Sequence, residues 1–381
     1  MKALSVFAAA LVVVSACGSS SVSAKAVVKA VSGGWNYALA LKSDGSVWAW
    51  GANDNGQLGN GTTTGSLVPI PVPSLAHGVI AIAAGWDAAV ALKSDGSVWT
   101  WGANDRGQLG DGSHAASQVP VRVSGIGGRV TAIAAGFSYA LTLKSDGTVW
   151  GWGDDFQGQL GNGQNADTTS PVAVHGLTGR VVAISAGKAH SLAIEADGSV
   201  WAWGDNGGGE LGVDTGDVFQ NTPVRVAGLS GHTLAVAAVV DHSAAIEAGG
   251  TLWSWGREFL PSGDYMGTDA PTPMPGLTNV KQIAGGWSFF VALEANGSVW
   301  AWGENLDTLG DGSGHDSPNN PVAVLGLDKG VVTIGTGIEN GYAVTSKGVV
   351  WSWGNNNHGE LGNGTVDPEG GSDQPVQMKS F

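Results

Sequence analysis

The chain has 381 residues, with 17 Lys or Arg against 32 Asp or Glu, which gives a formal net charge of −15 at pH 7. This acidic balance, with the basic residues scattered singly, excludes nucleic-acid binding, which needs clustered Lys and Arg. The 63 glycines and 17 tryptophans favour a repeat of strands and tight turns, and the single cysteine leaves the folded domain without a disulfide.

Residues 1–24 are predicted to be a signal peptide with a short tether. Lys2 precedes an apolar or small run from Ala3 to Val14 that is too short to span a membrane. Residues 14–17 resemble a bacterial lipobox, in which Cys17 becomes the acylated first residue of a lipoprotein. The alternative is cleavage after Ala24, which discards Cys17. We expect an extracytoplasmic protein, either anchored to the membrane of a bacterial cell envelope through Cys17 or secreted.

Residues 25–381 are predicted to form one domain built from a repeat of about 50 residues. The tetrapeptide Trp-x-Trp-Gly marks each unit, starting at Trp48, Trp99, Trp150, Trp201, Trp253, Trp300 and Trp351. The two tryptophans stand at i and i+2 of a predicted strand, so both project from one side of it. We expect them to fill the gap to a neighbouring unit rather than to bind a ligand, because packing demands the same residue from every unit.

The third unit shows the strands that each repeat contains. Apolar or alternating runs cover 130–134, 139–143, 149–152 and 171–174, and no longer window has a helical period. An Asp-Gly pair separates the second and third runs, at Asp146-Gly147 here and at Asp44-Gly45 in the first unit. This pair predicts a hairpin with a type I′ turn. Four strands in each of seven units predict an all-β fold, a seven-bladed β-propeller with four-stranded antiparallel blades.

The repeated wording resembles one protein family. Trp-x-Trp-Gly is followed by Gly-Gln-Leu-Gly at 56–59, 107–110 and 158–161, and by Gly-Glu-Leu-Gly at 209–212 and 359–362. In this order the motifs resemble the regulator of chromosome condensation repeat family, whose members form seven-bladed propellers. The resemblance implies the fold more strongly than the function, because the family includes exchange factors, a photoreceptor and secreted inhibitors. An acidic, exported relative is not expected to share the chromatin role of the family's namesake.

The ends of the repeat array predict how the ring closes. The first unit begins with the run 27–31, and the last ends with Pro375-Val376-Gln377-Met378. We expect the chain to be cut between two strands of one blade, with the two ends meeting to close the ring and protect the sheet edges.

The candidate binding residues lie in the turn after the first strand of each unit, where the repeats differ. The first turn position is Trp35, Trp86, Phe137, Lys188, Val240, Trp287 or Ile338, and the second includes Asp241 and Glu339. Each blade presents this turn to the same face, so we expect a ring around one mouth of the central channel. Aromatic residues in turns on a rigid frame are typical of a protein-binding hot spot. The alternative is that they only plug the channel.

Other chemistry is weakly indicated. His190 and His242 occupy equivalent places in adjacent units and are expected to make structural hydrogen bonds. The acidic segments 162–167 and 311–316 lack the spacing of a calcium loop. The fifth unit lacks Gly-Gln-Leu-Gly and is either a specialised surface or a drifted repeat. We predict no catalytic residues, no metal site and no cofactor.

These observations predict an exported, lipid-anchored, monomeric propeller that binds an unidentified protein or glycan through the turn ring. One alternative is a secreted inhibitor of an envelope enzyme. Another is an enzyme acting on envelope polysaccharide, which would need two carboxylates about 5 to 9.5 Å apart. Photoreception, known in this family, is set aside because Asn36, Asp87 and Ser288 stand beside the turn tryptophans where the photoreceptor has arginines.

Overall fold

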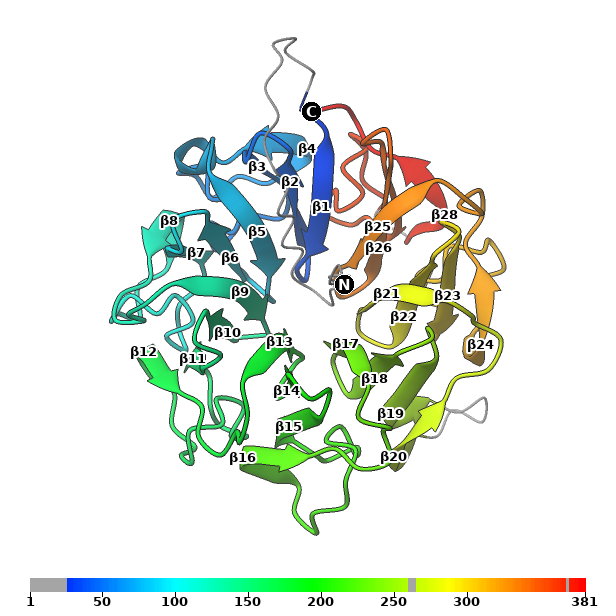
Figure 1. The fold of residues 1–381 in the computed structure, drawn as a ribbon. Coiled ribbons are helices and arrows are strands. Elements are labelled where there is room, and N and C mark those ends of the chain that lie inside the picture. The colour runs from blue at the N-terminus through cyan, green and yellow to red at the C-terminus, as the bar shows by residue number, and fades with distance from the viewer. Residues whose placement is uncertain (1–25, 260–264, 368–369) are drawn as a thin grey trace, which may run out of the picture.

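Seven four-stranded sheets surround a central channel (Figure 1). The computed structural model describes residues 26–259, 265–367 and 370–381. Each sheet contains four consecutive strands, paired antiparallel in chain order. The predicted all-β, seven-bladed propeller is confirmed. Within the described residues no helix has the length and apolar character that crossing a membrane requires.

The first four blades have similar strand lengths. Blade one contains β1 (Val28–Gly33), β2 (Tyr37–Lys42), β3 (Val47–Gly51) and β4 (Ser66–Pro71), followed by the short 3-10 helix η1 (Pro73–Leu75). Blade two contains β5 (Val79–Ala84), β6 (Ala88–Lys93), β7 (Val98–Gly102) and β8 (Ser117–Arg122). Blade three contains β9 (Val130–Ala135), β10 (Tyr139–Lys144), β11 (Val149–Gly153) and β12 (Thr168–Ala173). Blade four contains β13 (Val181–Ala186), β14 (His190–Glu195), β15 (Val200–Asp205) and β16 (Phe219–Arg225).

The last three blades include the aberrant fifth unit, which has the longest hairpin. Blade five contains β17 (Thr233–Ala238), β18 (His242–Glu247), β19 (Leu252–Phe259) and β20 (Tyr265–Pro273). Blade six contains β21 (Val280–Gly285), β22 (Phe289–Glu294), β23 (Val299–Gly303) and β24 (Ser317–Ala323). Blade seven contains β25 (Val331–Thr336), β26 (Asn340–Thr345), β27 (Val350–Asn355) and β28 (Gly371–Gln377).

The Asp-Gly hairpins form where predicted, but with a different turn. Gly45 has φ 79°, whereas the positive-φ residues other than glycine in the described chain are Asn279 and Asp307. Gly45 N donates to Lys42 O at 3.0 Å, which makes a type I turn followed by a left-handed glycine. The Asp44 carboxylate accepts from Ser46 N at 3.0 Å. The aspartate therefore caps the turn from the right-handed region, and the predicted type I′ geometry is wrong.

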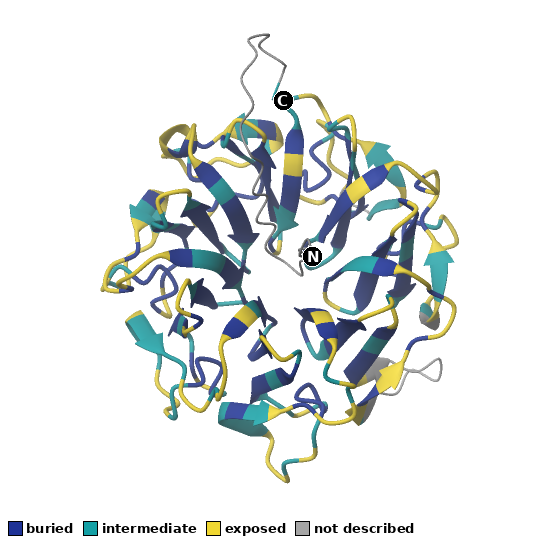
Figure 2. Ribbon diagram, in the orientation of Figure 1, coloured by how far each residue is buried: buried dark blue, intermediate teal, exposed yellow. Residues whose placement is uncertain are grey.

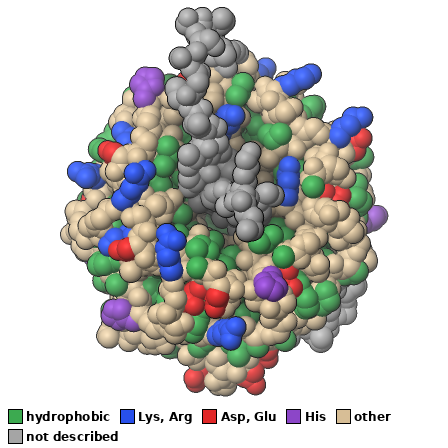
Figure 3. Space-filling model, in the orientation of Figure 1, with side chains coloured by type: hydrophobic (Ala, Val, Ile, Leu, Met, Phe, Trp, Pro, Cys, Tyr) green, Lys and Arg blue, Asp and Glu red, His purple; other side chains and the backbone are tan. Residues whose placement is uncertain are grey.

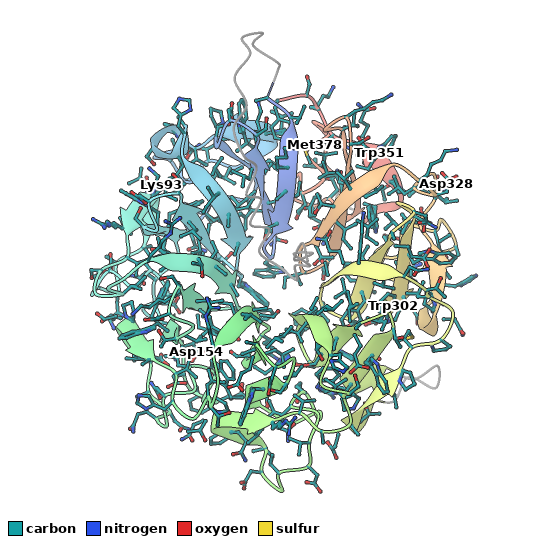
Figure 4. The ribbon with its side chains drawn as sticks, in the orientation of Figure 1. Lys93, Asp154, Trp302, Asp328, Trp351 and Met378 are labelled. Atoms are coloured by element: carbon teal, nitrogen blue, oxygen red, sulfur yellow. The ribbon has the colours of Figure 1, made fainter. Side chains whose placement is uncertain are left out.

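The second tryptophan of each motif is buried in an inter-blade core. Figure 2 shows buried residues along the strands of every blade. Trp101 is fully buried and packs among Leu39, Val47 and Leu58 of blade one. Trp302 likewise lies in a cluster with residues of blade five (Figure 4). The first tryptophan packs against the same cluster but is only partly buried. Both indoles therefore face the neighbouring blade, as predicted.

The Gly-Gln-Leu-Gly motif supplies the partner of the buried indole. Trp101 Nε1 donates to the Gln57 carbonyl at 2.8 Å, and Trp152 Nε1 to the Gln108 carbonyl at 2.9 Å. A Cβ on Gly59, which has φ 64°, would lie 2.8 Å from Trp101 Nε1, so the second glycine lets the loop approach the indole. The motif recurs because it seals each blade to the next.

The ring closes differently from the prediction. Blade one is made of β1 to β4 and blade seven of β25 to β28, so the chain is cut between blades and not within one. The ends do meet, because Val28 and Val31 share a core with Tyr342 and Met378. Trp50 Nε1 also donates to the Glu360 carbonyl at 2.7 Å, which repeats the bond found between other neighbouring blades.

Candidate binding face

The strand order gives the propeller two chemically distinct faces. The turn from the first to the second strand and the loop from the third to the fourth lie on one face, which we call the mouth face. There Ala52 N donates to Asn36 O at 2.7 Å. The turns between the second and third strands and the blade-to-blade connections lie on the other, the connector face, where Val79 N donates to Gly45 O at 3.2 Å.

The candidate turn residues are joined edge to edge around the channel mouth. Trp35 N donates to the Trp86 carbonyl, and Trp86 N to the Phe137 carbonyl, both at 3.0 Å. On the far side Trp287 N donates to the Ile338 carbonyl at 2.6 Å. The channel below has a cavity of about 120 Å³, and Lys188 is among its lining residues. The turns thus occupy the predicted position, whereas their role in binding stays a prediction.

Four aromatic side chains of the ring meet over the mouth. The Trp86 ring centroid lies 4.5 Å from that of Trp35 and 4.4 Å from that of Phe137, its two neighbours in the ring. It also lies 6.1 Å from the ring centroid of Trp287, which comes from blade six across the channel. Trp35 and Trp287 each remain 39% exposed. The aromatic cluster therefore covers the mouth and also presents indole surface to solvent.

A charged sector completes the ring. Lys188 Nζ lies 3.7 Å from Asp241 Oδ1, and Arg257 Nη1 lies 3.9 Å from Asp241 Oδ2. Asp205, Glu210 and Asp241 offer carboxylate oxygens within 4.8 Å of one another. Among the described residues, this group of carboxylates has the geometry to hold a metal ion. Burial and the charges of Asp205 and Asp241 raise the pKa of Glu210 to about 7. Lys188 and Arg257 already supply positive charge at this place.

The remaining candidate turn residues contact the outer loops. Gln57 Nε2 of blade one lies 3.5 Å from Asp87 Oδ1 of blade two. Burial, together with repulsion from Asp105 and Asp54, raises the pKa of Asp87 to about 6. Asn355 Nδ2 donates to Glu339 Oε2 at 2.6 Å. Acidic groups are therefore crowded together on this face.

One of the two predicted structural histidines makes a hydrogen bond between blades. His190 Nε2 lies 2.9 Å from Ser243 Oγ of blade five. The equivalent residue of blade three is Tyr139, whose Oη donates to the His190 carbonyl of blade four at 2.6 Å. Burial lowers the pKa of His190 to about 3 and that of His242 to about 4. Both imidazoles are neutral near pH 7. His190 makes the expected structural hydrogen bond, whereas the His242 ring packs edge-on against the Phe290 ring of blade six, with centroids 5.9 Å apart.

One acidic loop contains a buried carboxylate oxygen without a partner. Leu160 N donates to Asp155 Oδ1 at 2.9 Å, just as Leu58 N donates to Asn53 Oδ1. The Asn53 amide nitrogen donates to the Thr62 and Thr64 carbonyls at 2.9 and 3.0 Å, whereas Asp155 Oδ2 has no hydrogen-bond partner. Burial is the main cause that raises the pKa of Asp155 to about 7.

Two sequence features fall partly or wholly outside the described residues. Cys17 and the predicted signal peptide lie in 1–25, and the tip of the blade-five hairpin lies in 260–264. The described part of blade five retains the packing of a repeat, because Trp255 is fully buried. It departs from the repeat at Val239, which stands where the other blades have glycine. A Cβ on Gly285 would lie 2.2 Å from Val239 Cγ1, so blade six accommodates the larger side chain with its own glycine.

Comparison with protein families identifies the fold's lineage. The family model described as RCC1-like domain matches residues 14–259, more than half of the chain. The chain belongs to this RCC1-like family. Models of the regulator of chromosome condensation (RCC1) repeat also match residues 280–307 and 347–381. The predicted family is therefore confirmed.

This RCC1-like chain is similar to proteins of different kinds. It is 35% identical to the human E3 ubiquitin-protein ligase HERC2 over 224 residues, which are 57% of this chain and 5% of HERC2. It is 31% identical to the Arabidopsis thaliana ultraviolet-B receptor UVR8 over 234 residues, 60% of this chain and 53% of UVR8. The chain thus spans about half, or much less, of these curated relatives.

Solved structures match over most of both chains. Yeast RCC1 (Prp20), solved with Kap60 bound, is 26% identical with a TM-score of 0.74 and covers 86% of this chain and 80% of its own. Human WBSCR16 is 25% identical with a TM-score of 0.73, and the match covers 83% of this chain and 85% of WBSCR16.

Sequence reasoning missed two features of the site. The contact between Trp287 and Trp86 joins blades six and two across the channel, and a linear repeat holds no information on which side chains lean inward far enough to meet. The orphan oxygen of Asp155 had a readable signal, since Asn53 and Asn104 hold the same place in blades one and two.

Proposed function

We propose that this RCC1-like propeller is a non-catalytic binding module that grips a protein partner with its mouth face. The observation that carries this proposal is the aromatic cluster, in which Trp35 and Trp287 are each 39% exposed on turns held by inter-blade backbone bonds. Rigid, partly exposed indoles give large contact area at little cost in conformational entropy, which makes them frequent hot spots.

The relatives support a binding role for a propeller of this shape. Yeast RCC1 was solved in complex with Kap60, and the structure of Prp20p from Saccharomyces cerevisiae was described together with its binding properties to Gsp1p and histones. These partners belong to those proteins. A monomeric propeller acting through one of its faces is consistent with such complexes.

We also propose that the protein is exported and tethered through a lipid on Cys17. The lipobox-like sequence at residues 14–17 motivates this proposal. β1 begins at Val28 on the connector face. A tether ahead of Val28 would join that face and leave the mouth face turned away from the membrane, where a partner can reach it. Mass spectrometry of the mature protein would detect acylated Cys17, whereas an unlipidated chain starting after Ala24 would overturn this part.

The enzyme alternative gains little support. The carboxylates of Asp205, Glu210 and Asp241 converge within 4.8 Å, below the spacing of about 5 to 9.5 Å that glycosidases use. Glu210 is only 2% exposed, and Gly208 N donates to one of its oxygens at 2.9 Å. A secreted inhibitor of an envelope enzyme is a special case of the binding proposal and differs from it only in the partner.

The test is a pulldown from envelope extract with the mature protein. It is run beside a variant with Trp35, Trp86 and Trp287 changed to Ala, and beside a control with Trp99 changed to Ala, an outer tryptophan away from the mouth. A partner retained by the control and lost by the mouth variant, with circular dichroism showing both folded, supports the proposal. A partner retained by both variants would overturn it.

A further inference from the structure

Acidic side chains gather on the mouth face. The start of the loop between the third and fourth strands carries a carboxylate in most blades, namely Asp54, Asp105, Asp154, Asp205 and Glu304. The turn ring adds Asp87, Asp241 and Glu339. Because the topology sends both segments of every blade to the same face, these charges surround the aromatic cluster. Among the described residues, these carboxylates therefore give the mouth face a negative charge around the aromatic cluster.

Basic side chains are found mainly on the other side. The second strand of each of the first three blades ends on the connector face with a lysine, namely Lys42, Lys93 and Lys144. Each ammonium lies about 5 Å from the ring centroid of the first tryptophan of the motif in the same blade. In Figure 1 the blade-to-blade connections run in front of the sheets. Figure 3, in the same orientation, shows Lys and Arg side chains spread around this connector face.

The few bases on the mouth face do not balance its carboxylates. Among its described residues the lysines and arginines are Arg106, Lys188 and Arg257, and each lies within 4 Å of an aspartate oxygen. Repulsion from Asp105 and Asp54 adds to the burial that raises the pKa of Asp87. An added positive charge would be attracted to this place.

From this charge distribution and the exposed indoles, we infer that the mouth face recognises a lysine- or arginine-rich segment of a partner protein. One cationic side chain lies against the indoles of the aromatic cluster, as ammonium and guanidinium groups favour aromatic faces. Flanking bases pair with Asp87, Glu339 and the loop carboxylates. The inference rests on the proposed function and adds the chemistry of the partner.

The test measures binding of a labelled oligolysine peptide to the mature protein by fluorescence anisotropy, with an oligoglutamate peptide of equal length as comparison. A mouth variant changes Asp54, Asp87 and Asp105 to Asn. The matched control changes Asp44, Asp146 and Asp328 on the connector face to Asn, which alters net charge by the same amount. Changing the repelling carboxylates to Asn also relieves the crowding at Asp87, so the mouth variant should fold at least as well as the parent.

We expect oligolysine to bind the parent, about tenfold weaker binding to the mouth variant, and a change of less than about twofold in the control. Equal weakening in both variants would show that net charge alone attracts the peptide and would overturn the inference. Absence of oligolysine binding would overturn it too. The proposed function would survive either result if the pulldown partner were still lost with the tryptophan variant.

Discussion

Two tryptophans of blade two show how one repeat serves both stability and recognition. Trp101 is fully buried, packs against blade one and donates Nε1 to the Gln57 carbonyl at 2.8 Å. Trp86 lies in the mouth turn, where its ring makes tilted and edge-on contacts with side chains that differ from blade to blade. The buried position is the same residue in every blade and the turn position is not. The inter-blade core is thus under a common packing requirement, whereas the mouth is free to vary.

The largest expected effect on stability is the difference between removing a buried core indole and removing an indole of the mouth turns. We expect Trp101→Ala to lower the free energy of unfolding by about 3 to 5 kcal/mol, because it leaves a cavity between two blades and an unpaired Gln57 carbonyl. Trp86→Ala should cost about 1 kcal/mol or less, since its neighbours remain partly exposed. Urea denaturation of both variants measures the difference. Similar losses in the two would show that the mouth cluster is a second core.

A glycine tests how tightly the mouth turns are joined. A Cβ on Gly85 would lie 2.4 Å from the Gly136 carbonyl oxygen of the next blade. Gly85→Ala should therefore destabilise the protein by about 2 kcal/mol through overpacking against backbone. Gly207→Ala is the control, because the nearest atom to its Cβ is a side-chain oxygen at 3.4 Å. A Gly85→Ala variant as stable as the control would mean that adjacent turns can move apart.

The smallest effect concerns Asp155, the exception at a position where blades one and two have asparagine. Its pKa is raised from 3.8 to about 7 in the folded state, so its contribution to stability is fully present below about pH 4 and is lost as the pH rises to about 7. Asp155→Asn should raise the free energy of unfolding by about 1 kcal/mol above that pH and leave it nearly unchanged in acid.

The measurement for Asp155 is thermal or urea unfolding of the parent and the variant across this pH range. Asn104→Asp supplies the converse, since Asn104 Nδ2 donates to the Ser113 and Ala115 carbonyls at 3.0 Å and the change should introduce the same pH dependence into blade two. A pH-independent gain from Asp155→Asn would show that the Asp155 carboxyl does not titrate in this range.

Most of the fold could be predicted from the sequence repeat. The paired tryptophans and the Asp-Gly hairpins placed the strands of blade three to within a few residues, because their spacing reports local periodicity directly. The turn type was wrong because Asp44 caps its own turn, which a dipeptide does not reveal. The cut within a blade was wrong because an array of repeats looks alike whichever strand is taken as its first.

The candidate site was predicted less completely. The turn ring was located by aligning the units, yet the meeting of Trp287 with Trp86 depends on side-chain directions across the channel. The sorting of charge between the faces was within reach, since it needs only the strand order and the position of each carboxylate along its unit.

The way the ring closes has a consequence for how such a chain can change. No described strand is shared between blades one and seven, and their seam repeats the indole-to-carbonyl bond found between covalently connected neighbours. The break in the backbone is therefore interchangeable with any connection between blades. A gene rearrangement that moved the start to another blade, or duplicated a whole unit, would leave every sheet intact and give selection a fresh set of mouth residues to work on.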